Sequence, residues 1–429
     1  MQQCNQNFRI SILIGKLIAA AVMASGCGGG SVSTAPNSSG GAAYDGSSMP
    51  AAVVEAQKAD TAVDPAIVAA DNAFGLNVLN NLIAGSTDNI AISPISLSLA
   101  LHILYNGAAG TTQQAMAQTL QLGDISAQKL NSDNAALQAS LTNPDPKVQL
   151  TIANSLWINL SSSPVLPSFT QMDETYYGAT LGDLSGAPAN VNAWVAEKTG
   201  GLIADILPPL PPPGGYKVAV IANALYFKGE WTTAFDLGQT AVAAFTLSNG
   251  AETSAEMMHQ TGTYAYLQGA NFQAIRIPYG QGRLNMLIVL PDPGTTMSRF
   301  VAGITNELLT NWDAEFQNSL VSIALPRFTS TYSKSLPSAL TSLGMGIAFG
   351  QSADFSTLAP GAYVSDVEHK TVVEVDETGT VAAAATAVGV TTTIASPQGT
   401  MTMDHPFLYA IQDSQTGELL FIGVLMDPS

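Results

Sequence analysis

Histidine, serine and lysine are the side chains of this sequence whose types could carry out hydrolytic chemistry. There are four histidines, but the sequence contains no H-E-x-x-H zinc motif and no G-x-S-x-G nucleophile elbow. Three strings typical of serine β-lactamases do occur: S-x-x-K at residues 126–129, S-D-N at 132–134 and K-T-G at 198–200. In those enzymes the first two strings lie on separate elements, whereas here Ser132 follows Lys129 in one polar stretch. The spacing argues against an enzyme, and the sequence shows no metal-ligand cluster.

A different role is indicated by residues 373–396, VEVDETGTVAAAATAVGVTTTIAS. After Glu377 no residue is charged until Asp404, and most side chains are small. Alanine and glycine are poor strand formers, but small uncharged side chains suit a segment that slides between two existing strands, because burying an unpaired charge costs several kcal/mol. Backbone hydrogen bonds at roughly 1 kcal/mol each would return on the order of 10 kcal/mol for a dozen residues. The composition predicts a loop that inserts into a sheet, and the alternative is a passive flexible linker.

Blocks of sequence on both sides of this segment occur in a characteristic order. Upstream stand NIAISPISLSLALHILYNGAAGTT at residues 89–112, VNAWVAEKTGGLI at 191–203 and VIANALYFKGEWTTAF at 220–235. Downstream stand LPRF at 325–328, LGMGIAF at 343–349, VEHKTVVEVDETGTVAAAAT at 367–386, DHPFLYAI at 404–411 and LLFIGVLMDP at 419–428. In order and spacing they resemble the serpins, a family of protease inhibitors, and several blocks in order are more specific than one short motif. The resemblance implies an α+β fold in which helices come first and large mixed β-sheets follow, with an exposed reactive loop.

Composition fits one large acidic domain. The 429 residues are 46% hydrophobic, which is ample for a core, and the blocks run through one continuous unit. Only 11% of residues are charged, with 14 basic against 32 acidic. A chain of this charge without a Lys/Arg cluster is not expected to bind nucleic acid or an anionic membrane surface. We expect no cofactor.

The N-terminus has the features of an export signal. In residues 1–26, Arg9 and Lys16 supply positive charge, an apolar stretch follows, and A-S-G-C at 24–27 resembles a bacterial lipobox. In a lipobox the cysteine thiol, here Cys27, is acylated and anchors the protein to a membrane by lipid. We therefore expect an extracytoplasmic protein at the outer membrane or cell surface. An ordinary cleaved signal with an incidental cysteine is the alternative.

Two further segments follow this signal. Residues 27–64 are rich in Gly, Ser and Ala, which predicts a flexible tether of roughly 30 Å root-mean-square length. Residues 65–429 form the predicted folded domain. Once the signal is removed, Cys27 is the only cysteine, so no intrachain disulfide can form. The stability of the domain must come from packing.

Hydrophobic periodicity and turn residues predict the elements of the domain. Helices that precede strands, with long-range strand pairing, fit the α+β class. Central strands are expected to be apolar on both faces, and a hairpin is expected where two short apolar runs flank a turn. The predicted elements are helices at 65–84, 94–107 and 191–207, strands at 149–159 and 218–227, a hairpin of 272–278 with 284–291, and mostly strands after Pro360.

The resemblance assigns a polar cluster beneath the main sheet. In serpins a histidine, two serines and an asparagine lie under its centre, and the matching residues here are His369, Ser93, Ser96 and Asn223. Hydrogen bonds can be exchanged when strands separate, whereas hydrophobic interdigitation would lock the sheet. Trp231 matches the aromatic residue at the top of this sheet, where insertion begins. From the residues alone, His369 is expected to be a buried hydrogen-bonding group and Trp231 a core residue.

A hinge is also implied before the loop. Glu377 closes the preceding strand, although it could equally form a surface charge pair with Lys228, and Gly379 supplies torsional freedom. Thr380 is the first side chain to be buried on insertion, and a charged or bulky residue there marks non-inhibitory members. Val381 stands where inhibitory members often have glutamate, at a position that faces solvent after insertion. The predicted hinge residues are Glu377, Gly379, Thr380, Val381, Ala382, Ala383, Ala384, Ala385 and Thr386.

The family's usual loop length, counted from Glu377, places the cleaved bond between Thr393 and Ile394, within a window at residues 390–396. The resemblance implies a suicide substrate: a serine protease is trapped as an acyl-enzyme when the loop inserts. A small or β-branched residue before the bond suits an elastase-like or subtilisin-like protease, or a cysteine protease with aliphatic preference. A trypsin-like protease needs Lys or Arg before the cleaved bond, and residues 371–429 contain neither. The rival is a non-inhibitory surface binding module on a serpin scaffold, and in either case we expect a monomer.

Overall fold

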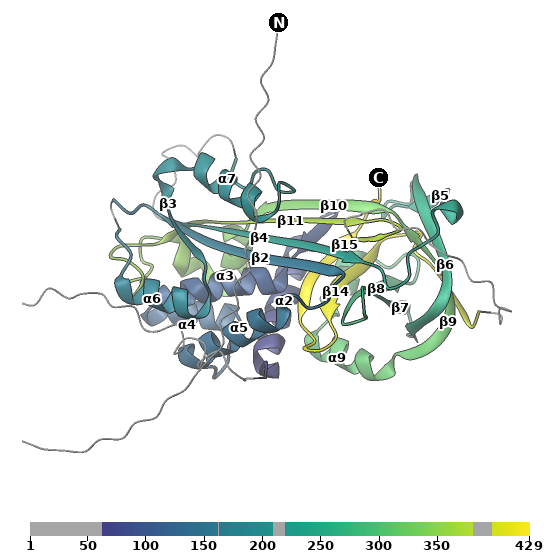
Figure 1. The fold of residues 1–429 in the computed structure, drawn as a ribbon, viewed down its shortest axis with the longest axis horizontal. Coiled ribbons are helices and arrows are strands. Elements are labelled where there is room, and N and C mark those ends of the chain that lie inside the picture. Colours follow the sequence, from purple (N-terminus) through teal and green to yellow (C-terminus); the bar gives the residue numbers. More distant parts are fainter. Residues whose placement is uncertain (1–61, 162, 209–218, 381–396) are drawn as a thin grey trace, which may run out of the picture. The chain divides into compact units, whose positions relative to one another are not determined.

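The computed structural model describes residues 62–161, 163–208, 219–380 and 397–429. Helices dominate the first part of the described chain and strands the second (Figure 1). The helices are α2 (Pro65–Ile83), α3 (Pro94–Gly107), α4 (Gly110–Thr119), α5 (Ala127–Leu141), α6 (Pro167–Tyr176), α7 (Ala189–Lys198), α8 (Met297–Ala302), α9 (Asn306–Glu315) and α10 (Pro337–Leu340). The strands are β1 (Ile90–Ile92), β2 (Val148–Ile158), β3 (Thr180–Asp183), β4 (Ala219–Glu230), β5 (Ala241–Thr246), β6 (Glu252–Gln268), β7 (Phe272–Pro278), β8 (Leu284–Pro291), β9 (Gln317–Pro326), β10 (Phe328–Ser335), β11 (Val364–Val375), β12 (Gly379–Thr380), β13 (Gly399–Thr402), β14 (Phe407–Asp413) and β15 (Leu419–Leu425).

Two mixed sheets organise these strands. The six-stranded sheet has the order β10-β11-β12-β4-β2-β3, and β11 also pairs directly with β4. The nine-stranded sheet has the order β1-β15-β14-β8-β7-β6-β9-β13, with β5 paired to β6. Helix α7 lies on one face of the six-stranded sheet and α3 on the other (Figure 1). The predicted α+β class is therefore confirmed.

The local sequence explains why α3 lies where it does. Ser93 precedes the helix in an extended conformation and its hydroxyl accepts the Ser96 N–H, while Pro94 occupies the first turn. Every residue of α3 except Asn106 is buried. A helix that is buried on all its faces lies inside a protein, and here it forms the support beneath the six-stranded sheet.

Most predicted elements match the structure, and one helix is shorter than expected. The strand at β4 is central, and β7 and β8 pair as the expected antiparallel hairpin. The helix predicted over residues 191–207 ends at Lys198. Gly200 and Gly201 follow with φ of 61° and 84°, a left-handed backbone that ends a helix. None of the helices within the described residues combines the length and apolar character needed to span a bilayer.

Candidate functional site

The six-stranded sheet is partly open at one end, where β12 lies between β4 and β11. Over most of their length these two strands pair directly and in parallel, from Val364 with Ala219 to Thr371 with Leu225. Towards the end of β11, Thr380 of β12 instead pairs antiparallel with Val375 on one side and Gly229 on the other. The predicted loop therefore enters the sheet at its first two residues.

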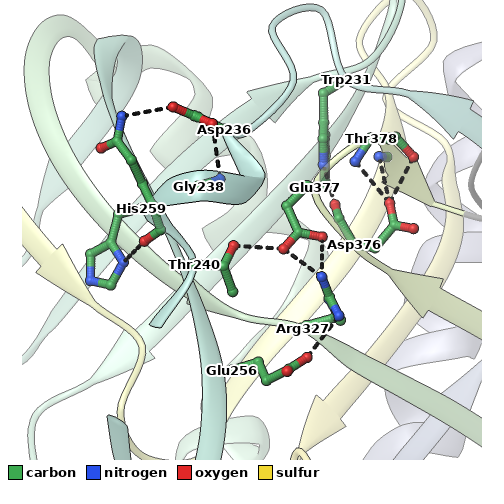
Figure 2. A network of polar contacts seen from close by, with 12 residues as sticks. Trp231, Asp236, Gly238, Thr240, Glu256, His259, Arg327, Asp376, Glu377 and Thr378 are labelled. Carbon is green, nitrogen blue, oxygen red and sulfur yellow. Dashed lines mark hydrogen bonds and ion pairs between the residues drawn. The ribbon is translucent and has the colours of Figure 1, made fainter. Parts of the chain in front are cut away.

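A tight turn carries the chain from β11 into β12. One Asp376 carboxylate oxygen accepts the N–H and hydroxyl of Thr378, both at 2.8 Å, and the N–H of Gly379 at 3.1 Å. The indole N–H of Trp231 donates to the Asp376 carbonyl at 2.8 Å, and the Trp231 N–H donates to the Thr378 carbonyl at 2.9 Å. Trp231 therefore holds the turn at this end of the sheet (Figure 2).

Glu377 lies in this turn, and its ion-pair partner is Arg327 and not Lys228. The Arg327 guanidinium donates to both Glu377 carboxylate oxygens at 2.6 Å, and the Thr240 hydroxyl donates to one of them at 2.6 Å. Arg327 also reaches Glu256 at 2.7 Å (Figure 2). Burial acts to raise the pKa of Glu377, but the hydrogen bonds from Thr240 and Arg327 outweigh it and hold that pKa below its ordinary value. The carboxylate ties the turn to the start of β10.

Thr380 is already buried in this state. Its exposed fraction is 0%, and its hydroxyl lies 2.6 Å from the hydroxyl of Tyr279, which is equally buried. The Tyr279 ring stacks on the Trp231 indole with centroids 4.4 Å apart and planes 11° apart. Burial raises the pKa of Tyr279, so the hydroxyl keeps its proton and can share this hydrogen bond. A small polar side chain fits the site, and a charged one would meet no partner there.

Gly379 is required by close backbone contact. A Cβ atom built at this position would collide with the carbonyl oxygen of Gly229 on β4. Gly379 pairs with Glu230 of β4, so its Cα lies against the backbone of Gly229 and Glu230 where β12 enters between its neighbours. A glycine at residue 379 therefore allows the backbones of β12 and β4 to lie close together. The sequence predicted a glycine here for a different reason, its torsional freedom.

The four residues of the predicted polar cluster come together beneath the centre of the six-stranded sheet. His369 Nε2 accepts the backbone N–H of Ser93 at 3.1 Å, so its proton lies on Nδ1, which donates to the Asn223 side-chain oxygen at 2.8 Å. The Asn223 amide donates to the Ser96 carbonyl at 2.6 Å and to the Ser96 hydroxyl at 2.5 Å. The Ser93 hydroxyl caps α3, so this serine contributes its backbone and not its side chain to His369.

This cluster links α3 to two strands that must part if a loop is inserted. His369 lies on β11 and Asn223 opposite it on β4. Burial lowers the pKa of His369 to about 3, so the ring is neutral. Asn154 on β2 also accepts from the Asn223 amide, at 2.5 Å. These bonds are few and polar, and each could be replaced by another partner when the strands separate.

Several residues of this site did not emerge from the sequence. The sequence pattern assigns no charge partner to Arg327 of the LPRF block, and Tyr279 lies in the predicted turn between residues 278 and 284 without a predicted role. Asn154 stood within a predicted strand as an ordinary polar residue. Each of them is a polar residue within a mostly apolar stretch of sequence, which is the one signal that could have identified them. Their partners could not be predicted because the contacts join residues far apart in the chain.

Other predicted positions lie outside the described residues. These include part of the hinge, the proposed cleaved bond between Thr393 and Ile394, the window at residues 390–396, and the lipidation site. The hinge residues concerned are Val381, Ala382, Ala383, Ala384, Ala385 and Thr386, and the lipidation site is Cys27.

The β-lactamase-like strings have ordinary structural roles. Ser126 caps α5, and Lys129 pairs with Asp64 at 2.5 Å and Asp133 at 2.9 Å. The Thr199 hydroxyl satisfies the end of α7 by donating to the Val195 carbonyl at 2.8 Å. Within the described ranges, no group of three or more His, Cys, Asp and Glu side chains is arranged to hold a metal ion.

Comparisons with known proteins agree with this geometry. The family model described as Serpin (serine protease inhibitor) matches residues 69–428. The chain is 35% identical over 379 residues to an uncharacterized serpin-like protein of Thermococcus kodakarensis, covering 84% of this chain and 86% of that protein. It is 32% identical over 356 residues to the leukocyte elastase inhibitor of Bos taurus, covering 79% and 93%.

Solved structures with the same fold extend the likeness. Tengpin, a thermophilic serpin in its native state, superposes with a TM-score of 0.80 and 30% identity over 86% of this chain and 96% of that one. Human thyroxine-binding globulin with thyroxine bound gives a TM-score of 0.77 and 27% identity over 85% and 98%. Serpins are protease inhibitors rather than enzymes as a family. The family match and these relatives span most of the chain, which therefore belongs to the serpin family.

Proposed function

We propose that this protein is an inhibitory serpin, a suicide substrate that traps a serine protease by inserting its cleaved loop into the six-stranded sheet. The observation that carries the proposal is Thr380, which lies at 0% exposure between β4 and β11 with an uncharged sequence behind it. A strand that has begun to enter a sheet can continue by adding one hydrogen-bonded pair after another. Small uncharged side chains keep the cost of each step low.

The first chemical step belongs to the protease. Its serine attacks the carbonyl carbon of the residue before the cut, which we place at Thr393, and the amide bond to Ile394 breaks as its nitrogen takes a proton. The loop remains attached to the protease as an ester. The chain from Thr380 onward then separates β4 from β11 and carries the protease with it, which distorts the oxyanion hole that deacylation requires.

The site contains a fixed turn from which insertion would begin and the strand contacts that would have to open for it. Trp231, Arg327 and Tyr279 hold the turn at Asp376, so insertion begins from a fixed point. Ahead of it lie the β4–β11 pairing and the His369–Asn223 contact, which must open. We infer that the polar cluster lowers the cost of that opening, because its hydrogen bonds can be remade with other partners.

A serpin fold alone does not distinguish an inhibitor from a binding protein, since one structural relative is a thyroxine-binding globulin. The hinge favours inhibition here. A binding module has no need for an uncharged segment that reaches from a buried threonine to Asp404. The two functions predict opposite results with an active protease.

The test is incubation with a panel of trypsin, chymotrypsin, pancreatic elastase and subtilisin, followed by denaturing electrophoresis and mass spectrometry of the released C-terminal peptide. We expect an SDS-stable adduct with elastase or subtilisin and a cut within residues 390–396. We expect none with trypsin, because residues 371–429 contain no Lys or Arg. Cleavage without an adduct by every protease would favour the binding module, and an adduct with trypsin would refute the specificity.

We further propose that the mature protein is held outside the cytoplasm by a lipid on Cys27. The A-S-G-C ending of the signal and the Gly/Ser/Ala-rich stretch after it support this proposal. An anchored inhibitor would meet proteases at the cell surface or outer membrane. Neither the anchoring nor a monomeric state is required for the trapping step itself.

A further inference from the structure

A group of ionisable residues is buried away from the hinge, between α2, α3 and the turn that joins β14 to β15. Asp71 on α2, His102 on α3 and Glu418 in the turn are each 0% exposed. Within the described part of the chain, none of the four carboxyl oxygens of Asp71 and Glu418 has a hydrogen-bond partner, and neither does His102 Nε2. His102 Nε2 lies 3.7 Å from an Asp71 oxygen. Buried polar groups are normally paired, so this group calls for an explanation.

The backbone around Glu418 is fixed against α2. The Asn72 side chain, next to Asp71, donates to the Gly417 carbonyl at 3.0 Å and accepts the Leu419 N–H at 2.9 Å. These two bonds bracket Glu418 in the sequence. These bonds fix the backbone on both sides of Glu418, whose side chain is fully buried.

The nearby cations are committed to other carboxylates. Arg283, from the β7–β8 turn, donates to both oxygens of Asp413 at 2.9 Å. Asp413 is itself buried and lies at the start of the same turn as Glu418. Lys129 on α5 pairs with Asp64 and Asp133 near the surface. Within the described residues, no Lys or Arg is among the groups that shift the pKa of Asp71 or Glu418.

The remaining face of the group is polar and includes one further acidic side chain, Asp173. The Asn134 amide on α5 lies 3.2 Å from His102 Nδ1 and 3.2 Å from the Tyr177 hydroxyl. With that amide donating to Nδ1, the imidazole proton lies on Nε2 and faces Asp71. Asp173 on α6 is the next acidic group on this side, and burial raises its pKa to about 6.

We propose that Asp71, Glu418 and His102 form a buried proton-binding site that couples the packing of α2 and α3 against the β14–β15 turn to pH. Two carboxylates without cations cannot both stay ionised in a dry interior. With His102 neutral, the group carries two acidic protons, one on each carboxyl. In the unfolded chain both carboxyls are ionised at neutral pH. Folding therefore takes two protons from solvent.

The pKa shifts agree with this geometry. Burial raises the pKa of both Asp71 and Glu418 well above the usual range; at Asp71 it outweighs the nearby Ser98 hydroxyl, which acts to lower that pKa, and at Glu418 the charges of Asp71 and Asp413 add to the rise. Burial lowers the pKa of His102 to about 3. A raised carboxyl pKa contributes stability that is full below the unfolded pKa and is lost as the pH rises towards the folded pKa. The lowered pKa of His102 acts in the opposite direction, below its unfolded value of about 6.5.

The test therefore uses the window from about pH 6.5 to 9, where His102 is neutral in both states. Unfolding in urea is followed for the wild type, Asp71→Asn, Glu418→Gln and the double variant. Each proton that the folded site holds and the unfolded chain releases should make the wild-type unfolding equilibrium constant rise about tenfold per pH unit relative to that of the double variant. The matched controls are Asp124→Asn and Glu315→Gln, which make the same chemical changes at exposed positions. Equal pH slopes in the wild type and the double variant would overturn the proposal.

An infrared measurement covers the case in which a variant does not fold. It uses a Glu368→Gln background, because burial and the nearby Asp366 raise the pKa of Glu368, a separate carboxyl on β11, to about 8. The proton-binding site predicts a protonated carboxyl C=O band that persists at pH 8 in the native protein and disappears on unfolding. Absence of that band at pH 8 would contradict the proposal without any substitution in the site.

Discussion

The hydroxyl groups of Thr380 and Tyr279 lie 2.6 Å apart where neither side chain is exposed to solvent. This contact joins the first inserted residue of β12 to the hairpin between β7 and β8, and the Tyr279 ring in turn stacks on Trp231. The start of β12 is therefore held by a hydrogen bond and by strand pairing. In the proposed mechanism insertion continues from this position, which makes it the most informative place to substitute.

Replacing Tyr279 by Phe should loosen the start of β12. The Thr380 hydroxyl would be left buried without a partner, at a cost of about 1–3 kcal/mol. Hydrogen exchange in a peptide covering residues 376–380 should accelerate. The matched control, Tyr264→Phe, removes a hydroxyl that bonds Gln260 away from the hinge and should leave that peptide unchanged. The double variant Tyr279→Phe/Thr380→Val should recover most of the protection from exchange, because it leaves no unpaired hydroxyl. If the effects of the two single substitutions on exchange simply add in the double variant, the two hydroxyls are not directly bonded.

The substitution Thr380→Arg should convert the inhibitor into a plain substrate. A guanidinium would have to enter a fully buried site beside Tyr279, at a cost of several kcal/mol. Insertion would then be slower than deacylation, so the protease would be released after cutting the loop. The measurement is the number of inhibitor molecules cleaved per protease trapped, with Thr380→Ser as the control that keeps the hydroxyl. Trapping at wild-type stoichiometry by Thr380→Arg would mean that this side chain does not enter the sheet.

The ion pair between Glu377 and Arg327 should stabilise the folded protein at neutral pH, and this stabilisation should be lost at low pH. The depressed pKa of Glu377 contributes stability that is present above the unfolded carboxyl pKa of about 4.3 and is lost as the pH falls through the folded pKa. Glu377→Gln should therefore lower stability at pH 7 by about 1–3 kcal/mol and approach the wild type in acid. Unfolding in urea from pH 7 down to pH 3 checks this. Glu256→Gln, which removes the more exposed partner of Arg327, should change little.

Replacing Cys27 by Ser should abolish lipidation and move the protein out of the membrane fraction, because one acylated cysteine carries the proposed anchor. Detergent phase partitioning of the wild type and the variant measures this. Ser25→Ala, a small-residue change within the same signal, is the control and should leave partitioning unchanged. Equal partitioning of wild type and Cys27→Ser would favour the ordinary cleaved signal.

Local rules predicted much of the frame of this molecule. Ser93 and Pro94 marked the start of α3, and two short apolar runs on either side of a turn marked the β7–β8 hairpin. The family blocks then identified His369 and Asn223 as neighbours, which periodicity alone could not do because they lie 146 residues apart. Spacing within an element is a local property, whereas strand partners are set by the whole topology.

The contacts that escaped prediction depend on tertiary geometry. Lys228 is close in sequence to Trp231 and looked available to Glu377, but Arg327 at the start of β10 is the residue that reaches it. Asp71 stands on an amphipathic helix where an acidic residue is expected to be exposed, yet it is buried against Glu418 on a distant turn. The helix predicted to continue to residue 207 ends at Lys198, because the two glycines that follow adopt a left-handed backbone.

The central claim is that cleavage lets the loop continue into the sheet from Thr380, and a comparison of thermal unfolding before and after one cut tests it most directly. The intact protein is nicked within residues 390–396 by thermolysin, a metalloprotease that attacks with a zinc-bound water, forms no acyl-enzyme and so cannot be trapped, and both forms are heated in parallel with a Thr380→Arg sample. Extra strand pairing in the six-stranded sheet predicts that the nicked wild type unfolds at a much higher temperature than the intact protein, and that the variant gains far less. Identical unfolding temperatures for the intact and nicked wild type would contradict the insertion mechanism.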